Sequence, residues 1–189
     1  MGILDGKTPT PEEAIEAIKI IGPHFDAWLN GPDISPRMKS IIELMGEGMS
    51  LAQILDISTP QLDALFIEGT RLIQAGETRK ARDLLTGLYQ LDPLTARTIY
   101  ALALTVQLEG EHEKAGKLYI QFLALDATNV EGYLRLGECF LANGEVQHAI
   151  DSFGTAINLA KAGHGTAAHI EHAKRMGDVA KARLASPKS

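Results

Sequence analysis

The sequence has 189 residues, of which 45 % are hydrophobic and 22 % are charged, and this composition is that of a globular protein with its own core rather than of a disordered chain. The formal net charge of −6 argues against a nucleic-acid or anionic-membrane partner, because phosphate binding requires clustered Lys and Arg. Cys139 is the only cysteine, so an internal disulfide is excluded and a reducing compartment fits.

The N-terminal part of the chain predicts a cytoplasmic location and a first helix. Residues 1–19 lack a basic segment followed by an apolar core, so no secretory signal is expected. No apolar run in the chain approaches the roughly 20 residues that span a bilayer. Thr10, Pro11 and Glu13 form a capping-box pattern, and the isoleucines that follow at threefold spacing give the helix a narrow apolar stripe.

Two further helices are predicted within residues 35–56. Ser35-Pro36 is a helix start, and residues 50–56 predict a shorter helix. On the longer helix, four apolar side chains recur at i, i+3, i+4 and i+7, the spacing of one helix face. These four candidates for a dimerisation surface are Met38, Ile41, Ile42 and Met45.

A motif with a period of 34 residues organises residues 58–161. The Gly-Glu pairs that begin at Gly76, Gly110 and Gly144 are 34 residues apart. Each is followed at fixed offsets by an alanine and then by a large side chain: Ala81 and Leu85, Ala115 and Tyr119, Ala149 and Phe153. This period and pattern are the signature of the tetratricopeptide repeat. The three predicted repeats cover residues 62–95, 96–129 and 130–161.

Each repeat is predicted to be a hairpin of two amphipathic helices, with glycine at the turn because it tolerates the backbone geometry that ends a helix. Thr59-Pro60 is expected to cap the first helix of the array. One hairpin cannot bury its apolar face alone, so the hairpins must stack. The predicted fold class is all-α: three tetratricopeptide repeats in a short right-handed solenoid with a concave surface, an N-terminal helical extension and a C-terminal capping helix.

Residues 162–189 predict a turn, a helix over about residues 166–184, and a frayed tail. The helix is rich in Ala, Lys and Arg and has few large apolar residues, which is typical of a capping helix with a polar outer face. His164, His169 and His172 cluster here, and the last two could reach one metal ion from one helix face. No cysteine or carboxylate at metal-site spacing completes a set, so solvated histidines are expected, with no metal and no cofactor.

Two roles for the N-terminal extension, residues 1–57, are compatible with the sequence. A solenoid requires a cap on its open end, and these helices would provide it. Alternatively they form a self-association surface, because their Ile and Met content exceeds what one capping helix needs.

The concave wall of the solenoid is the candidate functional surface. The chain has no phosphate-cradling glycine loop, nucleophile elbow or acid–base carboxylate pair, so an enzyme is not expected. The inward positions of the first helices carry apolar side chains, and exposed apolar patches mark binding sites. The predicted binding groove consists of Phe66, Thr70, Ile73, Tyr100, Leu104, Gln107, Leu134, Arg135, Glu138 and Leu141. The alternative is that a terminal helix folds into the groove and buries these residues as core.

The sequence around the first repeat carries a resemblance to a known family. The segment Met49-Ser50-Leu51-Ala52-Gln53-Ile54-Leu55 is followed by Thr59-Pro60-Gln61-Leu62-Asp63-Ala64-Leu65-Phe66. Gly76-Glu77 with Ala81, and then Leu91-Asp92-Pro93, continue the pattern. Over roughly residues 35–161 the chain resembles the class II chaperones of bacterial type III secretion.

The resemblance implies a chaperone that keeps hydrophobic translocator proteins soluble and unassembled before export. An extended client segment would lie in the groove and insert apolar side chains between its apolar residues, while Gln107, Arg135 and Glu138 would bond the client backbone. Family members commonly dimerise through N-terminal helices, so the resemblance favours self-association, as a homodimer.

The alternative function is that of a general repeat scaffold, which joins folded proteins in a secretion or regulatory complex. It predicts folded partners and binding through charged outer or terminal surfaces. A genomic neighbourhood of large proteins with apolar membrane-spanning segments would favour the chaperone.

Overall fold

The structure, a computed structural model, describes residues 35–185; the helix predicted to start near Thr10 and the C-terminal tail lie outside this range. The described elements are α2 (Pro36–Gly46), α3 (Leu51–Ile54), α4 (Thr59–Gln74), α5 (Thr78–Leu91), α6 (Ala96–Leu108), α7 (His112–Leu125), α8 (Val130–Ala142), α9 (Val146–Leu159), the π-helical turn η1 (Ala160–His164) and α10 (Ala167–Ala185). The described part of the chain is thus helical throughout, as the predicted all-α fold class requires.

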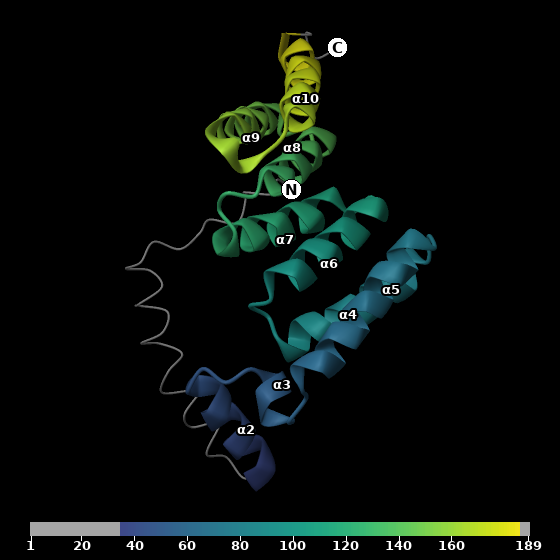
Figure 1. The fold of residues 1–189 in the computed structure, drawn as a ribbon, viewed down its shortest axis with the longest axis vertical. Coiled ribbons are helices and arrows are strands. Elements are labelled where there is room, and N and C mark those ends of the chain that lie inside the picture. Colours follow the sequence, from purple (N-terminus) through teal and green to yellow (C-terminus); the bar gives the residue numbers. More distant parts are fainter. Residues whose placement is uncertain (1–34, 186–189) are drawn as a thin grey trace.

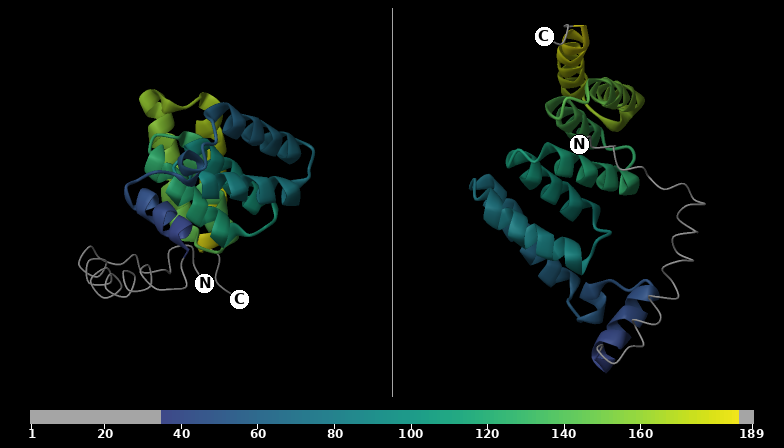
Figure 2. Two further views of the ribbon diagram at one scale, coloured as in Figure 1. Left: turned by 90° about the horizontal axis from the view of Figure 1, so that it is seen from below. Right: turned by 180° about the vertical axis from the view of Figure 1, so that it is seen from behind.

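Three helical hairpins stack along the long axis of the molecule. Helix α4 packs on α5, α6 on α7 and α8 on α9, and each hairpin also contacts the next one through α5 and α6 or α7 and α8. Figure 1 shows α2 and α3 at one end of this stack and α10 at the other, and the view from behind in Figure 2 gives the same order. The predicted repeat solenoid is confirmed.

The three Gly-Glu turns have one geometry, and it requires glycine. Gly76, Gly110 and Gly144 have φ values of 75°, 80° and 82°, in the left-handed region that other residues avoid. At each turn the glycine N–H and the following glutamate N–H return to carbonyls of the preceding helix, as from Gly76 to Ile73 and from Glu77 to Leu72. This paired bonding is a Schellman motif, so the 34-residue motif records how the first helix of each repeat ends.

Small residues in the first helix of each repeat let the second helix approach closely. A Cβ at Gly137 would lie 2.6 Å from Cε1 of Phe153, and a Cβ at Gly69 would lie 2.9 Å from Cδ2 of Leu85. Both of these large side chains are buried. The second repeat has Ala103 at the matching position, also fully buried. Side-chain volume thus alternates across each hairpin, which fills the core at native density.

The start of α4 differs by one residue from the prediction. The predicted cap, Thr59, is the first helical residue, and Ser58 is the N-cap. The backbone N–H of Ser58 donates to Oε1 of Gln61 over 2.8 Å. Ser50 and Gln53 form the same box at the start of α3. The prediction at Thr59 is wrong because both hydroxyl residues suit a cap and only the position of Gln61 selects between them.

An ion cluster ties the first repeat to the second. Arg82 of α5 forms ion pairs with the carboxylates of Glu109 and Glu111, which lie at the turn between α6 and α7. Lys114 also pairs with Glu111. The Arg82 guanidinium, followed by Lys114, lowers the pKa of Glu111 to about 2.

We expect acid to remove the stability that this cluster provides. An unfolded glutamate has a pKa of about 4.3, so folding lowers the pKa of Glu111. Such a group stabilises the folded state above its unfolded pKa, and the contribution is lost as the pH falls from about 4.5 towards the folded value of about 2. The Arg82→Met variant should melt below the wild type at about pH 6, and the gap should narrow as the pH approaches 2.

Thermal unfolding followed by circular dichroism at several pH values measures this gap. Arg79→Met is the matched control, because Arg79 lies on the same helix and is exposed. It removes the same charge without touching the cluster and should give a small gap at every pH. A gap for Arg82→Met that stays constant from about pH 6 to pH 2 would contradict the prediction.

Helix α10 closes the C-terminal end of the solenoid. The π-helical turn η1 leads into it, with Gly163 at a φ of 98°. Ala173, Gly177 and Ala180 form its buried stripe, and α10 packs on α9 through this stripe. Because these side chains are small, α10 lies close to its neighbour without large apolar residues of its own.

Candidate functional site

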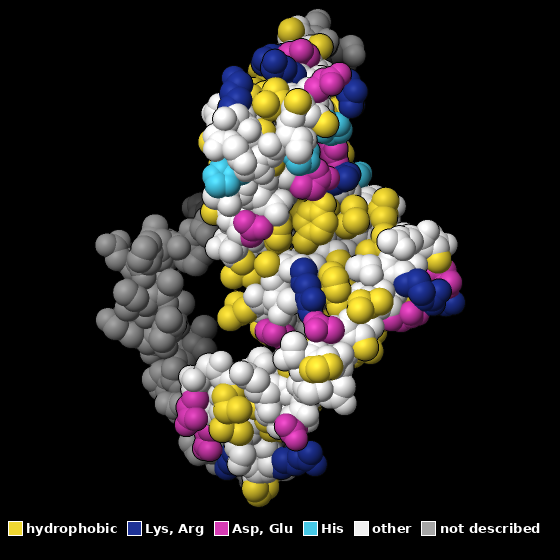
Figure 3. Space-filling view, in the orientation of Figure 1, with side chains coloured by type: hydrophobic (Ala, Val, Ile, Leu, Met, Phe, Trp, Pro, Cys, Tyr) yellow, Lys and Arg dark blue, Asp and Glu magenta, His cyan; other side chains and the backbone are white. Residues whose placement is uncertain are grey.

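An apolar groove lies where the first helices of the repeats face one another. Its volume is about 650 Å³. It is lined by Phe66, Thr70, Ile73, Gln74, Ala96, Arg97, Tyr100, Ala101, Leu104, Phe122, Asp126, Asn129 and Glu131. Figure 3 shows hydrophobic side chains gathered across the middle of this face, below a group of acidic, basic and histidine side chains at the level of α8 and α10. The groove contains five of the ten predicted binding residues, all of them from α4 and α6.

Aromatic contacts fix the floor of the groove. The ring of Tyr100 meets the ring of Tyr119 edge-on with 5.7 Å between centroids, and it meets Phe122 in the same way at 5.2 Å. Such edge-to-face pairs hold the half-buried Tyr100 in one orientation. Burial raises the pKa of Tyr100 above its ordinary value, so the hydroxyl stays protonated at neutral pH. The floor is therefore a preformed apolar surface with a single polar tip.

Arg97 borders the groove on the side of the first repeat. Its guanidinium lies over the ring of Phe66, 4.7 Å from the centroid, and also pairs with the carboxylate of Asp63. The predicted binding set omits Arg97. A signal for it was present: Asp63, Arg97 and Glu131 are 34 residues apart and alternate in charge, as a ladder between neighbouring repeats would require.

Two predicted groove residues, Leu134 and Leu141, are not exposed. Leu134 retains 3 % of its accessible surface and Leu141 retains 5 %, and both belong to the main core. Helix α10 lies against α8, and Nη1 of Arg183 donates to the carbonyl of Leu141 over 3.1 Å. The expectation of exposure is therefore wrong for these two residues. The alternative, in which a terminal helix covers the groove, holds for the third repeat.

The three predicted polar residues bond to one another instead of remaining open. Gln107 accepts a hydrogen bond from the Tyr119 hydroxyl at 2.8 Å and donates to Oε2 of Glu138 at 3.0 Å. Oε1 of Glu138 lies 3.0 Å from Nε2 of His172 on α10. Arg135 lies 3.3 Å from Glu138. The network thus runs from α7 through α6 and α8 to α10, and its groups have little capacity left for a client backbone.

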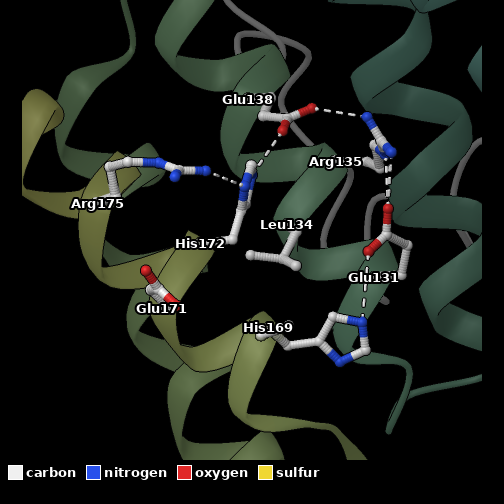
Figure 4. A pocket seen from close by; sticks show the side chains of 9 residues that line it. Glu131, Leu134, Arg135, Glu138, His169, Glu171, His172 and Arg175 are labelled. Atoms are coloured by element: carbon white, nitrogen blue, oxygen red, sulfur yellow. Dashed lines mark hydrogen bonds and ion pairs between the residues drawn. The ribbon is translucent and has the colours of Figure 1, made fainter.

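A polar hollow of about 420 Å³ lies between α8 and α10. Figure 4 shows Arg135 between the carboxylates of Glu131 and Glu138, with His169 and His172 projecting from α10 towards the same two carboxylates. Burial alone would lower the pKa of Arg135, but Glu138 and Glu131 outweigh it and raise the pKa, so Arg135 remains a cation.

The histidines of α10 serve this contact and not a metal site. The prediction of solvated histidines is wrong for His172, which approaches Glu138 at hydrogen-bond distance. Within residues 35–185, no three His, Cys, Asp or Glu side chains come together as a metal ion would require. Cys139 is buried in the core, and burial raises the pKa of its thiol to about 12, so it is not a reactive group.

The candidate dimerisation residues lie on α2, at the N-terminal end of the stack (Figure 1). Met45 retains 50 % of its accessible surface. Ile41 and Ile42 are half-buried, and the side chain of Met38 lies outside the described set. Every helix in residues 35–185 is too short or too polar to traverse a bilayer.

Solved structures of type III secretion proteins share this architecture. A type III secretion complex from Aeromonas hydrophila matches with a TM-score of 0.69 and 26 % identity, over 78 % of this chain and 99 % of that chain. PcrH, a Pseudomonas aeruginosa protein here in complex with the chaperone-binding region of PopD, matches with a TM-score of 0.60 and 29 % identity, over 68 % of this chain and 95 % of that one. The translocator chaperone SycD of Yersinia enterocolitica matches in fold, with a TM-score of 0.59 and 22 % identity over 71 % and 98 %.

These neighbours confirm the resemblance inferred from the sequence. No protein-family model matches the chain, and no curated protein matches it by sequence. The likeness is therefore carried by structure: the same stack of helical hairpins, in chains that are almost wholly covered by this one.

Proposed function

We propose that this chain is a cytoplasmic class II chaperone of a bacterial type III secretion system. It binds an extended apolar segment of a hydrophobic translocator protein and keeps that protein soluble and unassembled before export. The observation that carries the proposal is the preformed apolar groove on the concave face. Two structural neighbours support its use: PcrH has been solved with the chaperone-binding regions of PopD and of PopB, and SycD with a peptide of YopD.

The groove binds by apolar anchoring. Two or three client side chains enter between Phe66, Ile73, Tyr100 and Leu104, which all line the groove and are half-buried in the free chain. Each fully buried anchor contributes roughly 1.5–3 kcal/mol before the costs of ordering the segment. This chemistry makes and breaks no covalent bond, so the role is one of binding and not of catalysis.

The polar residues of the third repeat have a supporting role in this mechanism. Gln107, Arg135 and Glu138 hold α6, α8 and α10 together through the network described above. They keep the wall of the groove in place, and the client contacts shift towards the first two repeats. Gln74 and Thr70 are the polar side chains that the groove presents there.

The N-terminal extension, residues 1–57, provides the dimer contact in this proposal. Met38, Ile41, Ile42 and Met45 share one face of α2, and Met45 is open to a partner. SycD has been solved in an alternative dimer, which supports self-association for this fold.

Co-expression with translocators encoded in the same genome tests the proposal. Size-exclusion chromatography with light scattering should show a soluble stoichiometric complex with a membrane-active protein that is insoluble when expressed alone. The peak of the free chain in the same experiment gives its oligomeric state, for which we expect a dimer. If no such client is rescued and a folded soluble protein is bound instead, the chain is a scaffold and the proposal fails.

A further inference from the structure

The apolar groove continues towards the C-terminal end of the molecule. Asp126, Asn129 and Glu131 line the groove and also line a second hollow of about 350 Å³. Glu131 and His169 line this second hollow and also the polar hollow of about 420 Å³ between α8 and α10. The three hollows therefore form one trough, apolar at the first two repeats and polar at the third. Glu131 is the residue that all three share.

One carboxylate oxygen of Glu131 is an open acceptor at this junction. Oε1 accepts hydrogen bonds from Nε of Arg135 at 2.9 Å and from Nη2 at 2.8 Å. Oε2 has only Nε2 of His169 near it, at 3.8 Å, which is beyond hydrogen-bond distance. The side chain retains 35 % of its accessible surface. Glu131 thus combines a fixed orientation with an unused acceptor that faces open space.

The balance of charge around the polar hollows favours a cation. Four carboxylates line them, from Asp126, Glu131, Glu138 and Glu171, against two guanidiniums, from Arg135 and Arg175. With neutral histidines, the excess is two negative charges. Arg135 is already held between Glu131 and Glu138, as Figure 4 shows. Among the described residues Glu171 makes no hydrogen bond or ion pair, so it adds a second uncompensated carboxylate.

We propose that the bound segment is bipartite, with a lysine or arginine beside its apolar anchors, and that Oε2 of Glu131 receives this cation. The inference rests on the proposed function, because it assumes that a client chain occupies the apolar groove. A chain that lies extended in the groove and continues along the trough reaches Glu131 first among the carboxylates of α8 and α10. The apolar part supplies most of the affinity, and the charged part sets the register and direction of the segment.

Peptide binding tests this inference with defined probes. The probes are fluorescein-labelled 16-residue peptides with leucines at two anchor positions and one lysine moved through the remaining positions, each paired with a peptide that has glutamine in place of the lysine. For one or two lysine positions we expect about three- to fivefold tighter binding than for the glutamine partner, the size typical of a partly exposed ion pair. Raising the salt concentration should reduce this ratio.

Variants show whether Glu131 is responsible for the preference. Glu131→Gln should bring the lysine-to-glutamine ratio close to one, and Glu131→Lys should favour peptides with glutamate at the same position. Glu47→Gln is the matched control, since Glu47 is exposed and follows α2 at the far end of the stack; it should keep the wild-type ratio.

Each outcome separates the inference from the proposed function. If the leucine peptides bind but no lysine position is preferred, or if the preference persists in Glu131→Gln, the bipartite recognition is overturned and the apolar groove stands. If no peptide binds the wild-type chain, the proposed function fails and the inference fails with it.

Discussion

The Leu104→Glu variant should lose the client and keep its fold. Leu104 lines the apolar groove and is half-buried, so a glutamate there removes an anchor contact and places a carboxylate against apolar client side chains. Loss of one buried anchor costs about 1.5–3 kcal/mol, and desolvation of the new charge adds to this cost. We expect affinity for the translocator segment to fall by at least about 100-fold, measured by fluorescence anisotropy and by co-purification.

The same helix offers a matched control one turn away. Leu108 is the last residue of α6, retains 56 % of its accessible surface and is not among the residues that line the groove. Leu108→Glu makes the same chemical change on the same helix and should bind the client normally. Tyr100→Glu is a second groove variant and should behave as Leu104→Glu does. Normal binding by both groove variants, with unchanged circular dichroism spectra, would show that the client binds elsewhere.

The Gly137→Ala variant should be destabilised, although alanine is normally the better helix former. A Cβ at this position would lie 2.6 Å from Cε1 of Phe153, and Phe153 is buried in the core, where it has little room to move aside. Overpacking of this kind costs about 1–3 kcal/mol. Chemical denaturation should therefore show a lower free energy of unfolding for the variant, by about this amount.

Gly154→Ala is the control for this effect, and it should have the opposite sign. Gly154 lies in α9 next to Phe153, and a Cβ there would meet no atom within 4 Å. Alanine should raise the free energy of unfolding there by up to about 1 kcal/mol, because it restricts the unfolded chain more than glycine does. A neutral or stabilising Gly137→Ala would mean that Phe153 repacks freely and that glycine is not required between α8 and α9.

Local signals account for the parts of the fold that the sequence predicts well. Gly76, Gly110 and Gly144 each end a helix through a φ near 80°, which is a requirement of the few residues around each glycine. The close approach of paired helices depends on small residues such as Gly137, and the 34-residue period displays them in register. The apolar half of the groove could be predicted for the same reason, because it is made by equivalent positions in α4 and α6.

The parts that sequence reasoning missed depend on contacts between segments that are far apart. Leu134 and Leu141 occupy inward positions of their repeat, and their burial follows only from the placement of α10. That helix has few large apolar residues, so its pattern indicates a polar surface helix. Its attachment uses Ala173, Gly177 and Ala180, whose small size permits contact without producing a strong hydrophobic signal. The ties from His172 to Glu138 and from Arg183 to Leu141 span 34 and 42 residues and follow no repeat rule between them.

The docking of α10 also decides where the chain can be shortened without creating a new adhesive surface. A version that ends after α9 would uncover Leu134 and Leu141 together with the face of α9 that Gly177 approaches at Phe153. Such a fragment would be expected to precipitate or to capture apolar peptides indiscriminately. Pull-downs with it would report this artificial surface. Affinity tags and fusion partners are therefore best placed after Ala185, with the whole of α10 retained.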